Sequence, residues 1–140
     1  MIDQVRLSET NMMTKDGNPV HLAYEETGDI LEIVFPGVDA DYSIELTEQI
    51  LLGFNRKARR PAGLTILDFS ILATPTELGP RSFAVTGLAH LPDDLSETVA
   101  YILTHAPVTD FLKVITFYPS VGQTIPLTYL ENPQPMVVPA

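Results

Sequence analysis

The sequence predicts an α+β fold, with an antiparallel β-meander packed by two helices and followed by two further C-terminal strands. The first half carries short segments in which apolar and polar residues alternate, separated by turn residues, as in antiparallel strands. The middle carries apolar residues at helical spacing, and a strand-like pattern then returns. The length of 140 residues is that of one ordinary domain.

The chain is expected to divide into an arm, one domain and a tail. Residues 1–19 are polar and end in a turn-rich stretch, so we expect a loose N-terminal arm with a short strand at Gln4–Leu7. A single α+β domain is expected over residues 20–131. The tail, residues 132–140, is rich in proline and is expected to be extended.

Turn residues such as Thr27-Gly28 and Pro36-Gly37 divide the first half into strands. We expect these strands at His21–Glu25, Ile30–Phe35, Tyr42–Leu46, Gln49–Asn55 and Leu64–Phe69. Several strands carry apolar residues on the face opposite the main apolar set, namely Ile30, Val34, Leu51, Leu67 and Phe69. An antiparallel sheet normally has one wet face, so this surplus predicts that both faces are covered.

The second half begins with two expected helices. Gly79-Pro80 precedes the first, at Arg81–Ala89, because proline suits the first helical position. Asp94–Glu97 fits a capping box that opens the second helix, which ends before Pro107. Its apolar stripe consists of Leu95, Val99, Ile102 and Leu103.

Two strands are expected after these helices, at Phe111–Tyr118 and Thr124–Leu130. Pro126 lacks an N–H to donate to a neighbouring strand, so the last strand is expected at a sheet edge.

Charge and composition narrow the function classes. Eighteen acidic residues against eight basic ones give a net charge of −10, which repels nucleic acid and anionic membranes. The absence of cysteine excludes disulfides and thiolate chemistry. No apolar run has the roughly 18 residues of a membrane span, and Asp3, Arg6 and Glu9 interrupt any signal-peptide core. A cytoplasmic location is therefore expected.

Two segments carry a family resemblance. They are the stretch from Tyr24 to Phe35, which reads YEETGDILEIVF, and the later stretch from Gly63 to Ser70, which reads GLTILDFS. Over about residues 22–72 the chain resembles a family of small uncharacterised bacterial proteins, the domain of unknown function numbered 2283. The resemblance implies an antiparallel meander followed by a helix, with Asp29 marking the geometry of a turn. It implies no activity.

Acidic side chains form one set of candidate site residues. Asp39 and Asp41 alternate with Ser43 and Glu45 in a way that suits a hard cation, but Ile44 and Ile50 occupy the glycine and glutamate positions of a calcium loop. No two of the three histidines are three or four residues apart. We therefore expect no metal and no cofactor, and retain Asp29, Asp39 and Asp41 as a candidate acidic site.

The basic patch Arg56, Lys57, Arg59 and Arg60 is the sharpest local feature, because it holds four of the eight positive charges on one expected loop. It is a candidate partner-binding surface for a phosphate, an acidic protein or the acids of a second copy. The alternative is a turn that simply solvates its charges. Nucleic acid is disfavoured by the net charge.

Two function classes follow. The first is a non-catalytic interaction or regulatory module that self-associates as a two-fold dimer through its surplus apolar face. The alternative is a small-ligand-binding protein or a hydrolase-like enzyme with a carboxylate-based site at the three aspartates. The first is favoured, and catalytic residues are not assigned.

Overall fold

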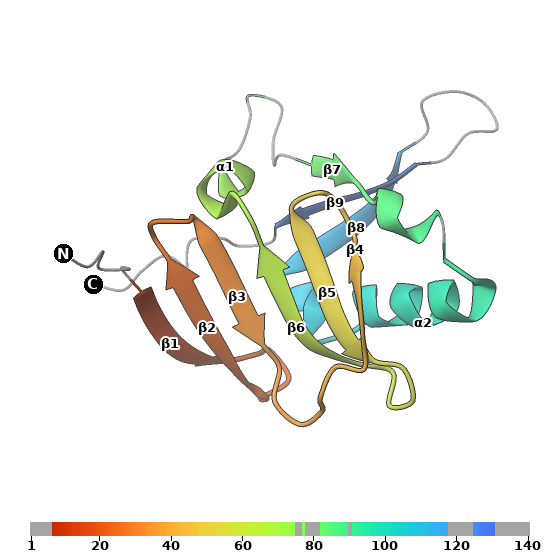
Figure 1. Ribbon diagram of the computed structural model, residues 1–140, viewed down its shortest axis with the longest axis horizontal. Helices are drawn as coiled ribbons and strands as arrows, with labels where there is room; N and C mark the ends of the chain where they lie inside the picture. The colour runs from red at the N-terminus through yellow and green to blue at the C-terminus, as the bar shows by residue number, and fades with distance from the viewer. Residues whose placement is uncertain (1–6, 75–76, 78–81, 90, 118–124, 131–140) are drawn as a thin grey trace.

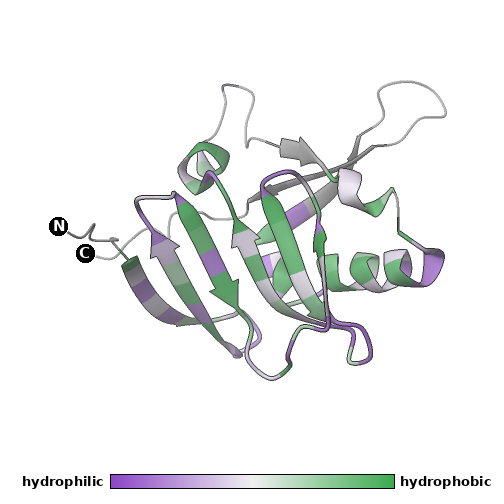
Figure 2. Ribbon diagram, viewed as in Figure 1, coloured by the Kyte–Doolittle hydropathy of each residue, from purple (hydrophilic) through white to green (hydrophobic). Residues whose placement is uncertain are grey.

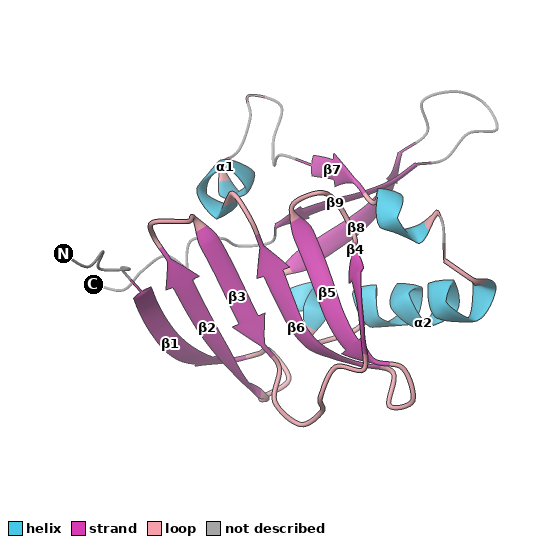
Figure 3. Ribbon diagram, in the orientation of Figure 1, coloured by secondary structure: helices cyan, strands magenta, loops and turns pink. Residues whose placement is uncertain are grey.

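The structure is a computed structural model that describes residues 7–74, 77, 82–89, 91–117 and 125–130. Its elements, in chain order, are β1 (Leu7–Met13), β2 (Pro19–Glu25), β3 (Ile30–Val34), β4 (Tyr42–Glu45), β5 (Ile50–Asn55), β6 (Arg60–Ile66), α1 (Phe69–Ala73), β7 (Ser82–Ala84), η1 (Thr86–Leu88), α2 (Asp93–Leu103), η2 (Val108–Asp110), β8 (Leu112–Phe117) and β9 (Ile125–Leu130). Antiparallel strands and two α-helices confirm the predicted α+β class (Figure 3).

The larger sheet has six strands in the order β1-β2-β3-β6-β5-β4, all antiparallel (Figure 1). It is a meander in two runs, β1-β2-β3 and β4-β5-β6, which join where β3 pairs with β6. Ile33 and Leu52 both lie opposite Leu64, which fixes the register across the centre of the sheet. The loop between β3 and β4 therefore passes the ends of β6 and β5, because β4 forms the far edge of the sheet.

One face of this sheet is buried. Leu31, Ile33 and Phe35 are at most 3% exposed, as their strand alternation predicts. The ring of Phe35 meets Phe111, which precedes β8, edge to face at 5.9 Å. Figure 1 shows α2 and the second sheet together behind the larger sheet, on the side of this core.

The opposite face, called the open face here, is exposed to half-buried in the described chain. It carries Glu32 and Val34 on β3 and Leu51 on β5, and Val34 is 43% exposed. The mixture of hydrophilic and hydrophobic positions on these strands is visible in Figure 2. The described residues of one chain therefore bury only one face of the sheet, and the expected cover of the second face stays a prediction.

The end of the first half differs from the sequence-based expectation. β6 ends at Ile66, and Asp68 adopts a left-handed conformation (φ 51°) that turns the chain into α1. This reversal breaks the two-residue period, so Phe69 lies in the core at 2% exposure and not on the second face. Its ring packs edge to face against Tyr24 at 5.7 Å.

The N-terminal segment also differs. Residues 7–13 form the edge strand β1, where a loose arm was expected. This strand pairs with β2 along its whole length, with Leu7 opposite Glu25 and Met13 opposite Pro19. Both faces of this strand are largely exposed, so it lacks the apolar alternation by which a strand is recognised in a sequence. The expected strand at Gln4–Leu7 and the tail 132–140 lie outside the described residues, apart from Leu7.

The second sheet contains three strands in the order β7-β9-β8. The helix expected at Arg81–Ala89 is wrong, because Ser82–Ala84 pairs with β9 as strand β7 and only Thr86–Leu88 forms a short 3₁₀ turn. β9 is central and not an edge strand. Its pairing with β7 stops at Leu127, so only β8 flanks Pro126.

Helix α2 matches its predicted apolar stripe, with Val99, Ile102 and Leu103 buried. It begins one residue before the expected capping box, and Asp94 lies in its first turn without a side-chain cap. Asp93 and Asp94 still suit the positive end of the helix dipole. Among the helices that the structure describes, none has the length and apolar character that crossing a membrane requires.

Candidate functional site

The β5–β6 turn holds the basic patch and is anchored at its base. The backbone N–H of Arg56 donates to Asp41 Oδ1 at 3.0 Å, and Arg56 Nε lies 3.3 Å from Asp41 Oδ2. The side chain of Asn55 accepts from Ala58 N–H and donates to the Asp39 carbonyl. Arg59 takes a left-handed conformation (φ 55°) that directs the chain into β6. These contacts fix the turn on the segment before β4.

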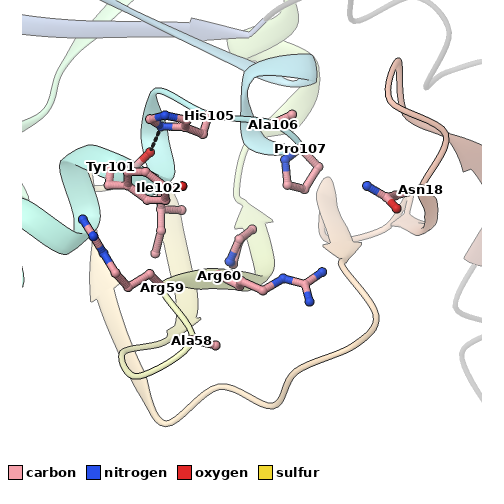
Figure 4. Close-up of a pocket in the computed structure, with 10 residues that line it drawn as sticks. Asn18, Ala58, Arg59, Arg60, Tyr101, Ile102, His105, Ala106 and Pro107 are labelled. Atoms are coloured by element: carbon pink, nitrogen blue, oxygen red, sulfur yellow. Dashed lines mark hydrogen bonds between the residues drawn. The ribbon is translucent and has the colours of Figure 1, made fainter.

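The basic patch is divided by this anchoring. Arg56 is committed to Asp41 and to the ring of Tyr42, whose centroid lies 5.2 Å from its guanidinium carbon. The hydrogen bond from the backbone N–H of Arg56, helped by its guanidinium, holds the pKa of Asp41 below its ordinary value, although desolvation opposes this. Arg59 is directed instead toward the C-terminal end of α2, whereas the guanidinium of Arg60 lies beside Gly37 in the segment after β3 (Figure 4).

That end of α2 carries a stack of three side chains. The Arg59 guanidinium carbon lies 4.3 Å from the centroid of the Tyr101 ring, and the His105 ring stacks on Tyr101 with a centroid distance of 3.9 Å. Burial of Ile102 and Leu103 anchors the helix on its other side, which leaves Tyr101 41% exposed. The stack orders Arg59, because a guanidinium over an aromatic face is attracted by the ring.

A hollow of about 410 Å³ opens between this stack and the neighbouring turns. We call it the basic hollow, and its lining includes Asn18, Arg59, Arg60, Tyr101, His105 and Pro107 (Figure 4). No carboxylate belongs to the lining, in a chain with a net charge of −10. In the part of the chain that the structure describes, neither Arg59 nor Arg60 has an ion pair.

Asn18 is held at the rim by a separate turn. Its backbone N–H donates to Thr14 Oγ1 at 3.1 Å, and its carbonyl accepts from Thr14 N–H at 2.8 Å. The backbone N–H of Lys15 donates to Asp110 Oδ2 at 2.7 Å, which ties this turn to η2. The basic hollow thus brings together three segments that are distant in the sequence, at Asn18, at Ala58–Pro61 and at Tyr101–Pro107.

The three acidic candidates do not form one site. Asp29 lies in the β2–β3 turn, at the end of the sheet where Ile50 pairs with Ile66. Asp39 and Asp41 lie by the β5–β6 turn at the opposite end. Among the described residues there is also no group of three or more His, Asp or Glu side chains arranged to hold a metal ion.

Asp29 has a structural environment of its own. Its carboxylate accepts from Tyr24 OH at 2.7 Å, from Ser70 Oγ at 2.7 Å and from Ser70 N–H at 3.0 Å. Desolvation opposes ionisation of Asp29, but the hydrogen bonds from Tyr24 and Ser70 together lower its pKa. The hydrogen bond from Tyr24 to Asp29, with burial and nearby negative charge, raises the pKa of Tyr24 to about 12. Asp29 therefore joins the β2–β3 turn to α1.

The sequence predicted the arginines of the basic hollow but not Asn18, Tyr101 or His105. Those residues carry no shared motif, since only the tertiary fold places them beside the turn. Comparison with known proteins adds no further assignment: no protein-family model, curated protein or solved structure matches the chain. The resemblance over residues 22–72 stays a prediction.

Proposed function

We propose that this protein is a non-catalytic, cytoplasmic binding module whose basic hollow takes small ligands that bear an anionic group. The observation that carries the proposal is the pair of guanidiniums, Arg59 and Arg60, that line the hollow without a carboxylate partner. Arginine forks match the oxygens of phosphate, sulfate and carboxylate groups. The hollow's size also falls at the lower end of the range for small-molecule sites.

The net charge of −10 bears on what can bind. A long anionic polymer would meet repulsion beyond the hollow, whereas a small ligand within it meets two arginines and no carboxylate. This contrast favours a small molecule over nucleic acid. Binding then depends on short-range contacts more than on long-range attraction.

Thermal unfolding tests the proposal. Because a ligand that binds only the native state stabilises it, inorganic phosphate or sulfate should raise the melting temperature by a few degrees over chloride at equal ionic strength. Arg60→Gln should abolish this rise. Lys57→Gln is the matched control, since Lys57 lies in the same turn but does not line the hollow. Equal stabilisation of both variants would contradict the proposal.

Self-association through the open face is the second candidate function. Exposed apolar side chains on that face favour it, since Leu7, Met13 and Val34 are 54%, 62% and 43% exposed. Each large apolar side chain left in water forgoes roughly 1.5–3 kcal/mol of burial. Glu9 and Glu32 lie on the same face, so a two-fold dimer would have to pair or solvate these carboxylates.

A further inference from the structure

We propose that two copies of this chain associate side by side through the outer edge of β1, so that their six-stranded sheets join into one continuous sheet. This interface does not involve the basic hollow, and it goes beyond the proposed anion binding. It also differs from a face-to-face dimer, because edge pairing leaves the open faces of both copies in solvent.

The outer edge of β1 pairs with no other strand of the described chain. β1 lies at one end of the strand order, next to β2. The Thr14 N–H donates to the Asn18 carbonyl at 2.8 Å, which directs the backbone of Thr14 toward β2. The direction of these groups alternates along a strand, and the β1–β2 register has no shift. The backbone groups that point outward therefore belong to Leu7, Glu9, Asn11 and Met13.

β1 lacks the features that commonly block pairing at a sheet edge. It is seven residues long and contains no proline, no lysine and no β-bulge. Its only charged residue, Glu9, lies 2.9 Å from His21 Nε2 on the neighbouring strand. The opposite edge differs, since β4 has four residues and the Gly87 N–H of η1 donates to the carbonyl of Leu46, just after that strand. Of the two edges, β1 is therefore the better site for a further strand.

The sequence of β1 is complementary to itself in an antiparallel pair. Two-fold symmetry requires one residue to face its own copy, because opposite residues lie on the same face of a sheet. An axis at Thr10 pairs the whole strand, with Leu7 opposite Met13 of the second copy and Glu9 opposite Asn11. Leu7 and Met13 are largely exposed in one chain. This register therefore brings two exposed apolar side chains together at each end of the interface.

The neighbouring two-fold registers are less favourable. An axis at Glu9 places two carboxylates opposite each other, in a chain that already has a net charge of −10. An axis at Asn11 shortens the pairing and places Met13 opposite Glu9. Because one register alone combines full length with matched side chains, the edge favours a second copy over an unrelated peptide.

Disulfide cross-linking tests the pairing and its register, because the chain has no cysteine of its own. The backbone of Thr10 points toward β2, so Thr10 and its copy would form a non-hydrogen-bonded pair with Cα atoms about 4.5 Å apart, within the range of disulfides. Ser8→Cys is the matched control on the same face, because Ser8 would face Met12 of the second copy and not itself. In a glutathione redox buffer, Thr10→Cys should form a covalent dimer more than about tenfold faster than Ser8→Cys.

Two further substitutions, each added to Thr10→Cys, separate this interface from others. Asn11→Pro removes an outward N–H that β1 does not use in pairing with β2, so it should slow the cross-link to the rate of Ser8→Cys. Circular dichroism establishes that this variant is folded. Val34→Asp changes the open face, which edge pairing leaves in solvent, and should leave the cross-linking rate unchanged.

Three results would overturn the proposal. Equal cross-linking rates for Thr10→Cys and Ser8→Cys would remove the predicted register. Monomeric products from both variants would remove the pairing itself. Loss of the Thr10→Cys cross-link on addition of Val34→Asp would assign the contact to the open face instead. None of these results alters the anion-binding proposal, which the phosphate and sulfate measurements test separately.

Discussion

At the scale of single residues, Asp29 shows how one side chain can join two elements. Its carboxylate receives three hydrogen bonds from Tyr24 and Ser70, and its own carbonyl accepts the N–H of Phe69, the first residue of α1. Asp29 itself has a left-handed backbone (φ 56°) that forms the β2–β3 turn. The role that the sequence resemblance implied, a marker of turn geometry, agrees with this placement.

Asp29→Asn should lower the free energy of unfolding at pH 7 by about 1 kcal/mol, because the amide accepts fewer hydrogen bonds and lacks the charge. Since the pKa of Asp29 is lowered in the folded state, its contribution is present above the unfolded value near 3.9 and disappears as the pH falls through the folded value. The free energies of unfolding of the wild type and the variant, measured with urea, should therefore converge below about pH 4. Asp41→Asn, at an exposed carboxylate, is the control and should show a much smaller change.

Tyr24→Phe tests the other side of this hydrogen bond at high pH. A tyrosine pKa that is raised to about 12 on folding contributes stability that is present below pH 10 and declines as the pH rises from 10 to 12. The wild type should therefore lose its stability advantage over Tyr24→Phe across that window. A constant difference between the two proteins from pH 8 to 12 would count against the contact.

At the scale of elements, local patterns predicted the strands and the helix with one buried and one exposed face. β3, β5 and α2 belong to this group, because burial on one side imposes a period of two or of 3.6 residues on the sequence. β1 and β7 were missed because distant backbone pairing holds them: β1 is exposed on both faces, and β7 pairs with residues 127–129. Pairing of this kind leaves no periodic signal.

The candidate site, too, has one part that the local sequence predicted and one part that only distant contacts create. The arginines were visible because four cations within five residues stand out in an acidic chain. The sequence did not show that these arginines have different roles. Arg56 is held by Asp41, whereas Arg59 and Arg60 line the hollow, and this difference depends on how the turn meets α2. Contacts between segments about 40 residues apart cannot be derived from the spacing of either one.

Gly87, in η1, packs closely against the backbone of Glu45 and Leu46, and a single added methyl group should disrupt this contact. Its N–H donates to the Leu46 carbonyl at 3.1 Å, and a Cβ at this position would overlap the backbone carbonyl oxygen of Glu45. Gly87→Ala should therefore destabilise the fold by at least about 2 kcal/mol, measured by urea unfolding. Gly53→Ala is the control, because its nearest neighbour, the Cβ of Ala40, lies at 3.4 Å. Equal stabilities of the two variants would show that η1 does not pack against β4 in this way.

At the scale of the whole molecule, the open face sets the expected oligomeric state. If the open face is the dimer interface, light scattering after size exclusion should give twice the chain mass of 15.4 kDa at micromolar concentration. Val34→Asp should return the protein to a monomer. Ile71→Asp, at an exposed residue of α1 outside the open face, should leave the dimer intact. Phe69→Asp is unsuitable, because it would place a charge in the core.

A wild-type protein that elutes as a single 15.4 kDa species would rule out this dimer. A dimer that persists in Val34→Asp would instead place the interface elsewhere. The basic hollow does not depend on a dimer through the open face, because it lies at the end of α2 and is formed within one chain. The two candidate functions are thus independent of each other.

The central claim is that the basic hollow binds anions, and a nuclear magnetic resonance titration with inorganic phosphate tests it most directly. At constant ionic strength, the backbone amides of Asn18, Arg59, Arg60 and His105 should shift together and reach saturation at one common affinity. The amides of Val34 and Leu51 on the open face should not move. Shifts that are absent from the hollow, or that spread over the surface without saturation, would contradict the claim.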